Sequence, residues 1–297
     1  MKLAVLGAGA WGTAFALAQH PRHAITLWTW QAEHCAAMRT SRRNEFLPGF
    51  DLPDAIAIEH DLPAALAGAE LIVVATPTGA MRSVLAAAAP HVKAPVIWLC
   101  KGFEPGTAKF PHQVAAETLA DGVLRGALSG PSFAEEIAKG LPAAITLASP
   151  SAEFAEQCAR ELHGPRLRIY SSPDLTGVEV GGAVKNVMAI AAGVCDGLGF
   201  GLSARAALMT RGLAEITRLG VRLGGRTETF LGLAGAGDLI LTCTGDLSRN
   251  RRVGLALAKG HPLERILADL GHVAEGVNTA REARRLAERH GVDMPIS

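Results

Sequence analysis

The stretch Leu3-Ala4-Val5-Leu6-Gly7-Ala8-Gly9-Ala10-Trp11-Gly12 indicates how the chain begins to fold. A short apolar run ends at three glycines spaced Gly-x-Gly-x-x-Gly, and a helical pattern follows over Thr13–Gln19. Gly7 allows a tight turn, Gly9 lets the backbone approach a pyrophosphate, and Gly12 lets the helix pack on the strand. The N-terminus of that helix would face the phosphates. The stretch therefore predicts a strand, a turn and a helix that bind a dinucleotide.

Apolar runs and helical patterns continue to alternate through the first part of the chain. Each run is apolar throughout, as is typical of a strand in a parallel sheet that is covered on both faces. Such strands are expected at Ala24–Thr29, Leu71–Ala75, Val96–Cys100, Ala143–Ala148 and Leu167–Tyr170. The alternation predicts the α/β class, with an N-terminal Rossmann-like domain built on a parallel sheet.

The pattern changes near Pro173. Strand signals give way to helical periodicity, interrupted by glycine-rich turns such as Gly232–Gly237. Helices are expected at Leu175–Cys195, Ser203–Leu219, Arg251–Ala258, Pro262–Asp269 and Asn278–His290. We therefore expect a dinucleotide-binding domain over residues 1–172 and an all-helical substrate and catalytic domain over residues 173–297.

The composition argues against several classes of function. Lys and Arg number 29 against 28 Asp and Glu, so a net charge of +1 favours neither nucleic acid nor anionic lipid as a partner. The apolar runs are shorter than the roughly 20 residues of a membrane span, and we expect no span. Glycines break the first run at once, which favours a buried strand over a signal peptide. The 5 cysteines lack metal-binding spacing, so we expect free thiols in the cytoplasm and no metal.

The end of the second expected strand bears on the choice of cofactor. A carboxylate normally stands there and holds the ribose hydroxyls of NAD. Here the sequence reads Leu27-Trp28-Thr29-Trp30-Gln31, and the first carboxylate is Glu33. Arg39, Arg42 and Arg43 come later. This leaves room for the 2′-phosphate of NADP, so the residues allow NADP or NAD.

Lys185 is the strongest candidate for a catalytic group. It lies in Gly181-Gly-Ala-Val-Lys-Asn186, inside an apolar helical pattern where its side chain cannot easily reach water. Burial favours the neutral amine and lowers the pKa, which suits a lysine to act as a general acid or base. The alternative is a structural lysine paired with an acid such as Glu179.

Two further segments carry polar groups in places suited to binding. Lys101 follows a buried strand, at the sheet edge where ligands bind, although a solvated lysine is the alternative. Asp238 lies among glycines ahead of an apolar run, so it needs a partner, for which Lys185 is the candidate. Ser248-Arg249-Asn250 begins a helix with groups that suit a phosphate, although a capped, solvated basic turn has the same pattern.

Together these segments resemble the bacterial type of NAD(P)-dependent glycerol-3-phosphate dehydrogenase. The resemblance runs the length of the chain and rests on Gly7–Ala14, Cys100–Gly102, Leu128–Ala134, Gly181–Asn186, Gly235–Leu239, Thr242–Thr244 and Ser248–Arg252. It implies interconversion of dihydroxyacetone phosphate and sn-glycerol 3-phosphate by hydride transfer with NAD(P)H. It also implies a cytoplasmic homodimer that supplies glycerophospholipid synthesis.

The resemblance assigns roles to individual residues. It makes Lys185 the catalytic proton donor and acceptor. The substrate contacts that it implies are Lys101, Gly130, Ser132, Lys185, Asp238, Ser248, Arg249 and Asn250. The cofactor contacts, including those of the glycine-rich turn, are Gly7, Gly9, Ala10, Trp11, Gly12, Lys101, Ala134, Arg249, Val273 and Glu275.

Three departures from the family pattern are visible. Ser132 stands where the family usually has Thr, which keeps the hydroxyl. Trp30 stands where a basic residue is more usual, which weakens the expectation of NADP. Relatives continue past Ser297 with a helical tail that this sequence lacks.

Two other functions fit parts of the pattern. Dehydrogenases of 3-hydroxy acids or of 6-phosphogluconate also place a lysine on a helix after a Rossmann domain. They usually space this lysine and its asparagine one helical turn apart, whereas Lys185 and Asn186 are adjacent. A nucleotide-binding sensor without turnover is the second alternative, but Lys101, Lys185 and Asp238 are all present.

Overall fold

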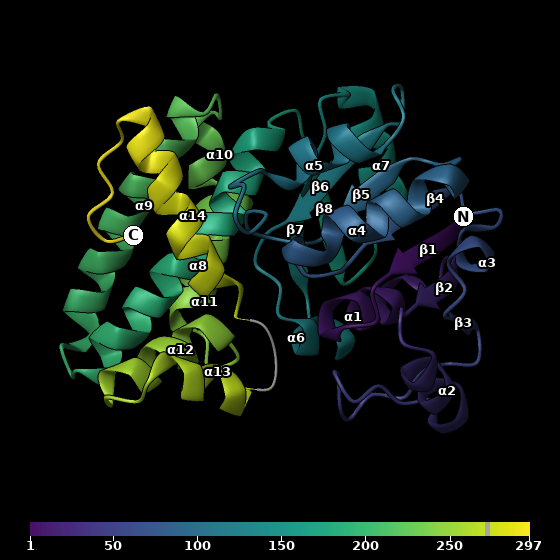
Figure 1. Cartoon of the computed structure of the whole chain (residues 1–297), viewed down its shortest axis with the longest axis horizontal. Coiled ribbons are helices and arrows are strands. Elements are labelled where there is room, and N and C mark those ends of the chain that lie inside the picture. Colours follow the sequence, from purple (N-terminus) through teal and green to yellow (C-terminus); the bar gives the residue numbers. More distant parts are fainter. Residues whose placement is uncertain (271–273) are drawn as a thin grey trace. The chain divides into compact units, whose positions relative to one another are not determined.

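The computed structural model describes residues 1–270 and 274–297, whose contacts divide the chain into two units. Unit 1 comprises Met1–Cys100, His112–Leu128 and Ser132–Pro173, and unit 2 comprises Lys101–Pro111, Ser129–Pro131 and Asp174–Ser297. Figure 1 shows the strands and helices of the first and the helices of the second. These units interleave along the chain, so the expected sequential domains 1–172 and 173–297 stay a prediction.

A single sheet organises unit 1. Its strands are β1 (Lys2–Leu6), β2 (Ala24–Trp28), β3 (Ile56–Glu59), β4 (Leu71–Val74), β5 (Val96–Trp98), β6 (Arg125–Ser129), β7 (Ala143–Ala148) and β8 (Leu167–Ser172). They lie in the order β3-β2-β1-β4-β5-β6-β7-β8, and the pairs from β3 to β6 and the pair β7–β8 are parallel. The connections leave β1 on one side and return on the other, which creates a switch point at its carboxyl end. The predicted α/β parallel-sheet class is confirmed.

The helices of unit 1 connect these strands. They are α1 (Ala10–Gln19), α2 (Ala32–Ser41), α3 (Leu62–Leu66), α4 (Thr78–Ala88), α5 (Pro111–Thr118), α6 (Ala134–Ala138) and α7 (Ala152–Leu162), with a 3₁₀ turn η1 (Ala89–His91). Glycine is required where α1 leaves β1, because a Cβ on Gly12 would lie 2.0 Å from the Gly7 carbonyl oxygen. The sequence pattern missed β3 and β6. In β3 buried and exposed residues alternate, and β6 begins with Arg125-Gly126.

Unit 2 is built around one long helix. Its helices are α8 (Leu175–Gly197), α9 (Gly201–Arg222), α10 (Thr227–Leu231), α11 (Asp238–Thr244), α12 (Arg249–Ala258), α13 (Leu263–Leu270) and α14 (Glu275–His290), with a π-helix η2 (Leu233–Gly237). Most of α8 is buried against α9, α11, α12 and α14. The segment Gly232–Gly237 is therefore mostly helical, and its interpretation as a turn was wrong. Its glycines pack against backbone: a Cβ on Gly235 would lie 2.1 Å from the Phe230 carbonyl oxygen.

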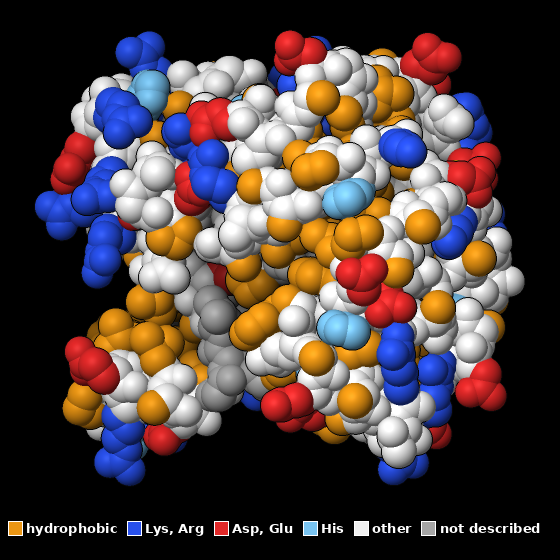
Figure 2. Space-filling model, turned by 45° about the vertical axis from the view of Figure 1, so that its right-hand side comes forward, with side chains coloured by type: hydrophobic (Ala, Val, Ile, Leu, Met, Phe, Trp, Pro, Cys, Tyr) orange, Lys and Arg blue, Asp and Glu red, His pale blue; other side chains and the backbone are white. Residues whose placement is uncertain are grey.

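Two surface properties bear on the expected partners. By length and composition α8 passes the test for a membrane span, but 83% of its most apolar window is buried inside the structure, as in a core helix. Basic and acidic side chains are interspersed over the face in Figure 2, in keeping with the near balance of charge.

Candidate active site

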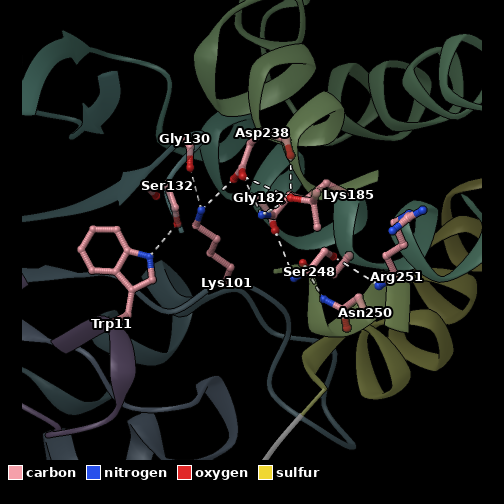
Figure 3. Close-up of polar contacts among 12 residues, drawn as sticks. Trp11, Lys101, Gly130, Ser132, Gly182, Lys185, Asp238, Ser248, Asn250 and Arg251 are labelled. Atoms are coloured by element: carbon pink, nitrogen blue, oxygen red, sulfur yellow. Dashed lines mark hydrogen bonds and ion pairs between the residues drawn. The ribbon is translucent and has the colours of Figure 1, made fainter. Parts of the chain in front are cut away.

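A carboxylate held between two lysines forms the centre of the site, and all three residues belong to unit 2. Lys185 Nζ donates to Asp238 Oδ1 at 2.6 Å, and Lys101 Nζ donates to Asp238 Oδ2 at 2.7 Å (Figure 3). Asp238 is 1% exposed and Lys185 is 7% exposed. The expected pairing of Lys185 with Asp238 is confirmed. Lys101 is a second partner that the sequence did not predict.

The buried helix α8 determines the acidity of Lys185. Burial lowers the pKa of Lys185 to about 8, because α8 surrounds the ammonium with apolar neighbours. The positive charge of Lys101 lowers it further, whereas the negative charge of Asp238 opposes both effects. Lys185 can therefore exchange a proton near neutral pH, as a general acid or base must.

Thr242 completes the surroundings of Lys185. Its hydroxyl accepts a hydrogen bond from Lys185 Nζ at 2.9 Å and donates to the Asp238 carbonyl oxygen at 2.6 Å. Thr242 lies four residues after Asp238 on α11, so both side chains face α8. Sequence reasoning did not assign it a role, although the i, i+4 spacing was visible.

The two lysines keep hydrogen-bonding capacity for a ligand. Each ammonium has three N–H donors. Lys185 uses two of them on Asp238 and Thr242, and Lys101 uses two on Asp238 and the Gly130 carbonyl oxygen at 3.0 Å. Within the described part of the chain, each ammonium thus retains one donor. Two cations around one carboxylate, each with a donor to spare, suit a substrate oxygen that gains negative charge.

Gly182 allows Lys101 to reach this position. A Cβ at Gly182 would lie 2.6 Å from Ser129 Oγ and 3.6 Å from Lys101 Cδ. The glycine-rich start of Gly181-Gly182-Ala183-Val184-Lys185 thus makes room beside α8 for the lysine that shares Asp238. Gly130 itself has a φ of 143°, a conformation that only glycine adopts readily.

A second polar group lies where α8, α12 and α14 meet. Asn250 Nδ2 donates to Asn186 Oδ1 at 3.0 Å, and the Gly276 backbone N–H donates to Asn250 Oδ1 at 3.1 Å. Asn250 therefore keeps one N–H beyond these bonds. Ser248 is the N-cap of α12 and its hydroxyl accepts from the Arg251 N–H at 3.2 Å.

The basic residues of this segment have different environments. Arg251 donates to Asp196 Oδ2 at 2.7 Å and to Asp246 Oδ1 at 2.9 Å, and Arg252 donates to the Asp246 carbonyl oxygen at 2.9 Å. Burial opposes the charge of Asp196, but hydrogen bonds from Arg251 and a second arginine outweigh it and lower the pKa of Asp196. Arg249 is exposed, and no hydrogen bond or ion pair engages it among residues 1–270 and 274–297. It is the arginine of this cluster that is available to a phosphate.

Glu275, at the start of α14, lies in the electric field of these cations. Burial raises the pKa of Glu275, and the charges of Arg249, Lys185 and Lys101 partly oppose that rise. Val273, the other cofactor contact expected near this helix, lies outside the described residues.

Unit 1 contains the expected nucleotide-binding turn. Gly7 has a φ of 120°, and Trp11 Nε1 donates to the Ser132 carbonyl oxygen at 3.2 Å (Figure 3). This bond connects α1 to the segment before α6, where Ala134 begins the helix. The turn from Gly7 to Gly12, with Ala10 and Trp11, therefore follows β1 at the switch point, as the spacing predicts.

The arginines near the end of β2 are engaged in structural contacts. Arg39 pairs with Glu59 at 3.1 Å, and Arg43 pairs with Asp51 at 2.7 Å. Arg42 donates to the Leu52 carbonyl oxygen at 3.0 Å and also reaches the next turn of the chain. By contrast, Trp30 is 74% exposed.

Metal chemistry finds no ligand cluster in the described residues. There, no group of three or more His, Cys, Asp or Glu side chains is arranged to hold an ion. Cys243 is next to Thr242 on α11, and burial raises the pKa of its thiol to about 12. That thiol stays protonated and is a poor nucleophile.

Comparison with known proteins gives one consistent result. Residues 2–155 match the family described as NAD-dependent glycerol-3-phosphate dehydrogenase N-terminus, and residues 174–297 match the one described as its C-terminus. The chain is 61% identical to the NAD(P)+ glycerol-3-phosphate dehydrogenase of Dechloromonas aromatica (strain RCB), and 60% identical to that of Thiobacillus denitrificans. Both alignments cover 100% of this chain and 91% of the relative.

A solved structure gives the same result. The crystal structure of glycerol-3-phosphate dehydrogenase from Coxiella burnetii is similar to this structure with a TM-score of 0.94 and 40% sequence identity. The match covers 99% of this chain and 91% of that one.

Proposed function

The chain belongs to the NAD-dependent glycerol-3-phosphate dehydrogenase family, and we propose that it interconverts dihydroxyacetone phosphate and sn-glycerol 3-phosphate using NAD(P)H. The observation that carries this proposal is Asp238 between Lys185 and Lys101, each with a donor to spare. Family membership favours this reaction over the 3-hydroxy acid dehydrogenases and over a sensor without turnover.

Lys185 is the proton donor in ketone reduction. Bound NAD(P)H supplies a hydride to the ketone carbon, and the C=O bond becomes an alkoxide. Lys185 donates a proton to that oxygen and becomes a neutral amine, which buried surroundings favour. In the opposite direction the neutral amine removes the hydroxyl proton. Asp238 and Thr242 hold the nitrogen in place throughout.

The other polar groups of unit 2 have complementary roles. Lys101 keeps its charge and directs its remaining N–H at the same substrate oxygen, which stabilises the alkoxide. Arg249 and the remaining N–H of Asn250 bind the phosphate, and this remote binding energy orients a small ketone. Gly130, Ser132 and Ser248 are the further substrate contacts of the proposal.

The residues present fit a dinucleotide. Gly7, Gly9 and Gly12 shape the turn for a pyrophosphate, and the N-cap of α1 has no side-chain hydrogen bond that would compete with it. Trp11, Ala134, Arg249 and Glu275 are the proposed contacts elsewhere. The cofactor is NAD or NADP.

Family membership also supports finer expectations. We propose that the enzyme works in the cytoplasm as a homodimer and supplies glycerophospholipid synthesis. Light scattering coupled to size exclusion tests the homodimer, because a mass close to the 30.9 kDa of one chain would contradict it.

Replacement of Lys185 tests the proposed chemistry. Lys185→Met keeps the length of the side chain but removes the proton, and we expect kcat to fall about 10²–10⁴-fold. Fluorescence titration with NADH should give an unchanged Kd, since the turn that binds the cofactor lies in unit 1. A variant that kept a kcat near that of the wild type would refute the role of Lys185.

A further inference from the structure

A buried polar network lies behind the glycine-rich turn of unit 1. Asn44, in the segment that follows α2, is 2% exposed. Its Nδ2 donates to the Ala8 carbonyl oxygen at 2.8 Å and to Thr13 Oγ1 at 2.6 Å. Its Oδ1 accepts from the Phe46 N–H at 3.0 Å and lies 3.1 Å from His34 Nε2. The amide therefore uses both donors and both acceptor positions.

The partners fix the orientation of each group. The Ala8 carbonyl can only accept, so Nδ2 of Asn44 must face it and Oδ1 must face His34. His34 therefore carries a proton on Nε2. Its Nδ1 lies 3.2 Å from the Thr29 hydroxyl, at the carboxyl end of β2. One continuous chain of hydrogen bonds thus connects the end of β2 to the glycine-rich turn.

The bond to Ala8 determines where the turn directs its donor. Ala8 C=O and Gly9 N–H belong to the same planar trans peptide unit, so they point in opposite directions. When Asn44 holds the oxygen behind the turn, the Gly9 N–H is directed to the front. There a Cβ on Gly9 would meet nothing within 4 Å. In the described residues the Gly9 N–H has no acceptor.

We propose that Asn44 is a positioning residue for the dinucleotide: it aims the Gly9 N–H at the pyrophosphate and, through His34 and Thr29, connects that turn with the end of β2. The proposal rests on the proposed function, because it assumes that the turn binds NAD(P)H. Asn44 does not touch the cofactor. It acts by reducing the freedom that the turn would otherwise lose on binding.

The test compares two buried amides of unit 1. Asn44→Ala removes the anchor of the turn. Gln19→Ala is the matched control, because Gln19 is also 2% exposed and donates to a backbone carbonyl, that of Leu162, at 3.0 Å. It stands at the opposite end of α1 from the turn. The readouts are the NADH Kd by fluorescence titration without substrate, kcat at saturating NADH, and the denaturant midpoint.

For Asn44→Ala we expect the NADH Kd to rise roughly tenfold, which corresponds to one lost hydrogen-bonded arrangement. The value of kcat at saturating NADH should stay within about twofold of the wild type, since Lys185 is untouched. Gln19→Ala should lower the denaturant midpoint without changing Kd. An unchanged Kd in Asn44→Ala, or an equal rise in Gln19→Ala, would overturn the proposal.

A milder variant decides the matter if Asn44→Ala does not fold. Thr13→Val keeps the shape of the side chain but removes one acceptor of the Asn44 amide. We expect its NADH Kd to rise roughly threefold, less than for Asn44→Ala. An unchanged Kd would refute the positioning role. Failure of the wild type itself to bind NADH and NADPH would instead overturn the proposed function, and this inference with it.

Discussion

Asp238→Asn tests the account of the two lysines most severely. The substitution keeps the size of the side chain, but the amide offers one oxygen where two ammonium groups donate at 2.6 Å and 2.7 Å. One lysine then faces an NH₂ group, and both lose their counterion. Removing one partner of a buried ion pair costs about 3–5 kcal/mol, so a lower denaturant midpoint is expected as well.

The effect on Lys185 can be estimated from its surroundings. Burial already lowers the pKa of Lys185 to about 8, with Asp238 opposing that shift. A carboxylate at this distance typically raises the pKa of a cation by about 1 to 3, so Asp238→Asn should bring the pKa of Lys185 to roughly 5 to 7. At a pKa of about 6 and a pH of about 7.5, only about 3% of Lys185 would be protonated, against roughly three quarters in the wild type. Ketone reduction should then slow by about 20-fold or more.

The assay is kcat against pH in both directions. Reduction needs protonated Lys185, so in the wild type kcat falls as the pH rises through about 8, and for oxidation it rises there. In Asp238→Asn both transitions should move to lower pH. Thr242→Val removes a hydrogen bond to Lys185 but leaves the charge, so its transition should move far less. An Asp238→Asn reduction profile that still fell near pH 8 would refute this reasoning.

Two further predictions concern substrate and cofactor. Arg249→Ala should raise the KM for dihydroxyacetone phosphate by about 10²-fold, without loss of stability, because Arg249 has no structural partner among the described residues. Arg252→Ala is the control, since Arg252 donates only to the Asp246 carbonyl; an equal rise in KM in both variants would contradict a specific role for Arg249. Trp30→Arg should raise kcat/KM for NADPH relative to NADH by roughly tenfold, since Arg39, Arg42 and Arg43 are engaged elsewhere and Trp30 is exposed. Steady-state kinetics with both cofactors measure this ratio, and an unchanged ratio would mean that Trp30 lies away from the 2′-phosphate.

Local features of the site could be predicted from the sequence. The glycine spacing indicated the turn after β1, because each glycine has a steric reason that depends only on neighbouring residues. The pairing of Lys185 with Asp238 followed from charge, because each is an ionisable residue in an apolar stretch and a buried charge needs a counterion. Ser248 begins α12 as the pattern of a capped helix suggests.

Features that depend on long-range geometry could not be predicted. Lys101 shares Asp238 although the two are 137 residues apart in sequence. Asn44 binds the Ala8 carbonyl from a segment without apolar periodicity, so nothing in the pattern pointed to a buried amide. The engagement of Arg251 depends on Asp196, which α8 brings to it. Such pairings follow from how the elements pack, and a single sequence does not contain that information locally.

The central claim is the reaction itself, and one measurement tests it directly. Dihydroxyacetone phosphate is added to the purified protein with NADH or NADPH, and the absorbance of the reduced cofactor is followed. We expect rapid loss of absorbance, with sn-glycerol 3-phosphate formed in equal amount to the cofactor oxidised. Bound cofactor without oxidation by dihydroxyacetone phosphate, under conditions where the protein is folded, would contradict the claim.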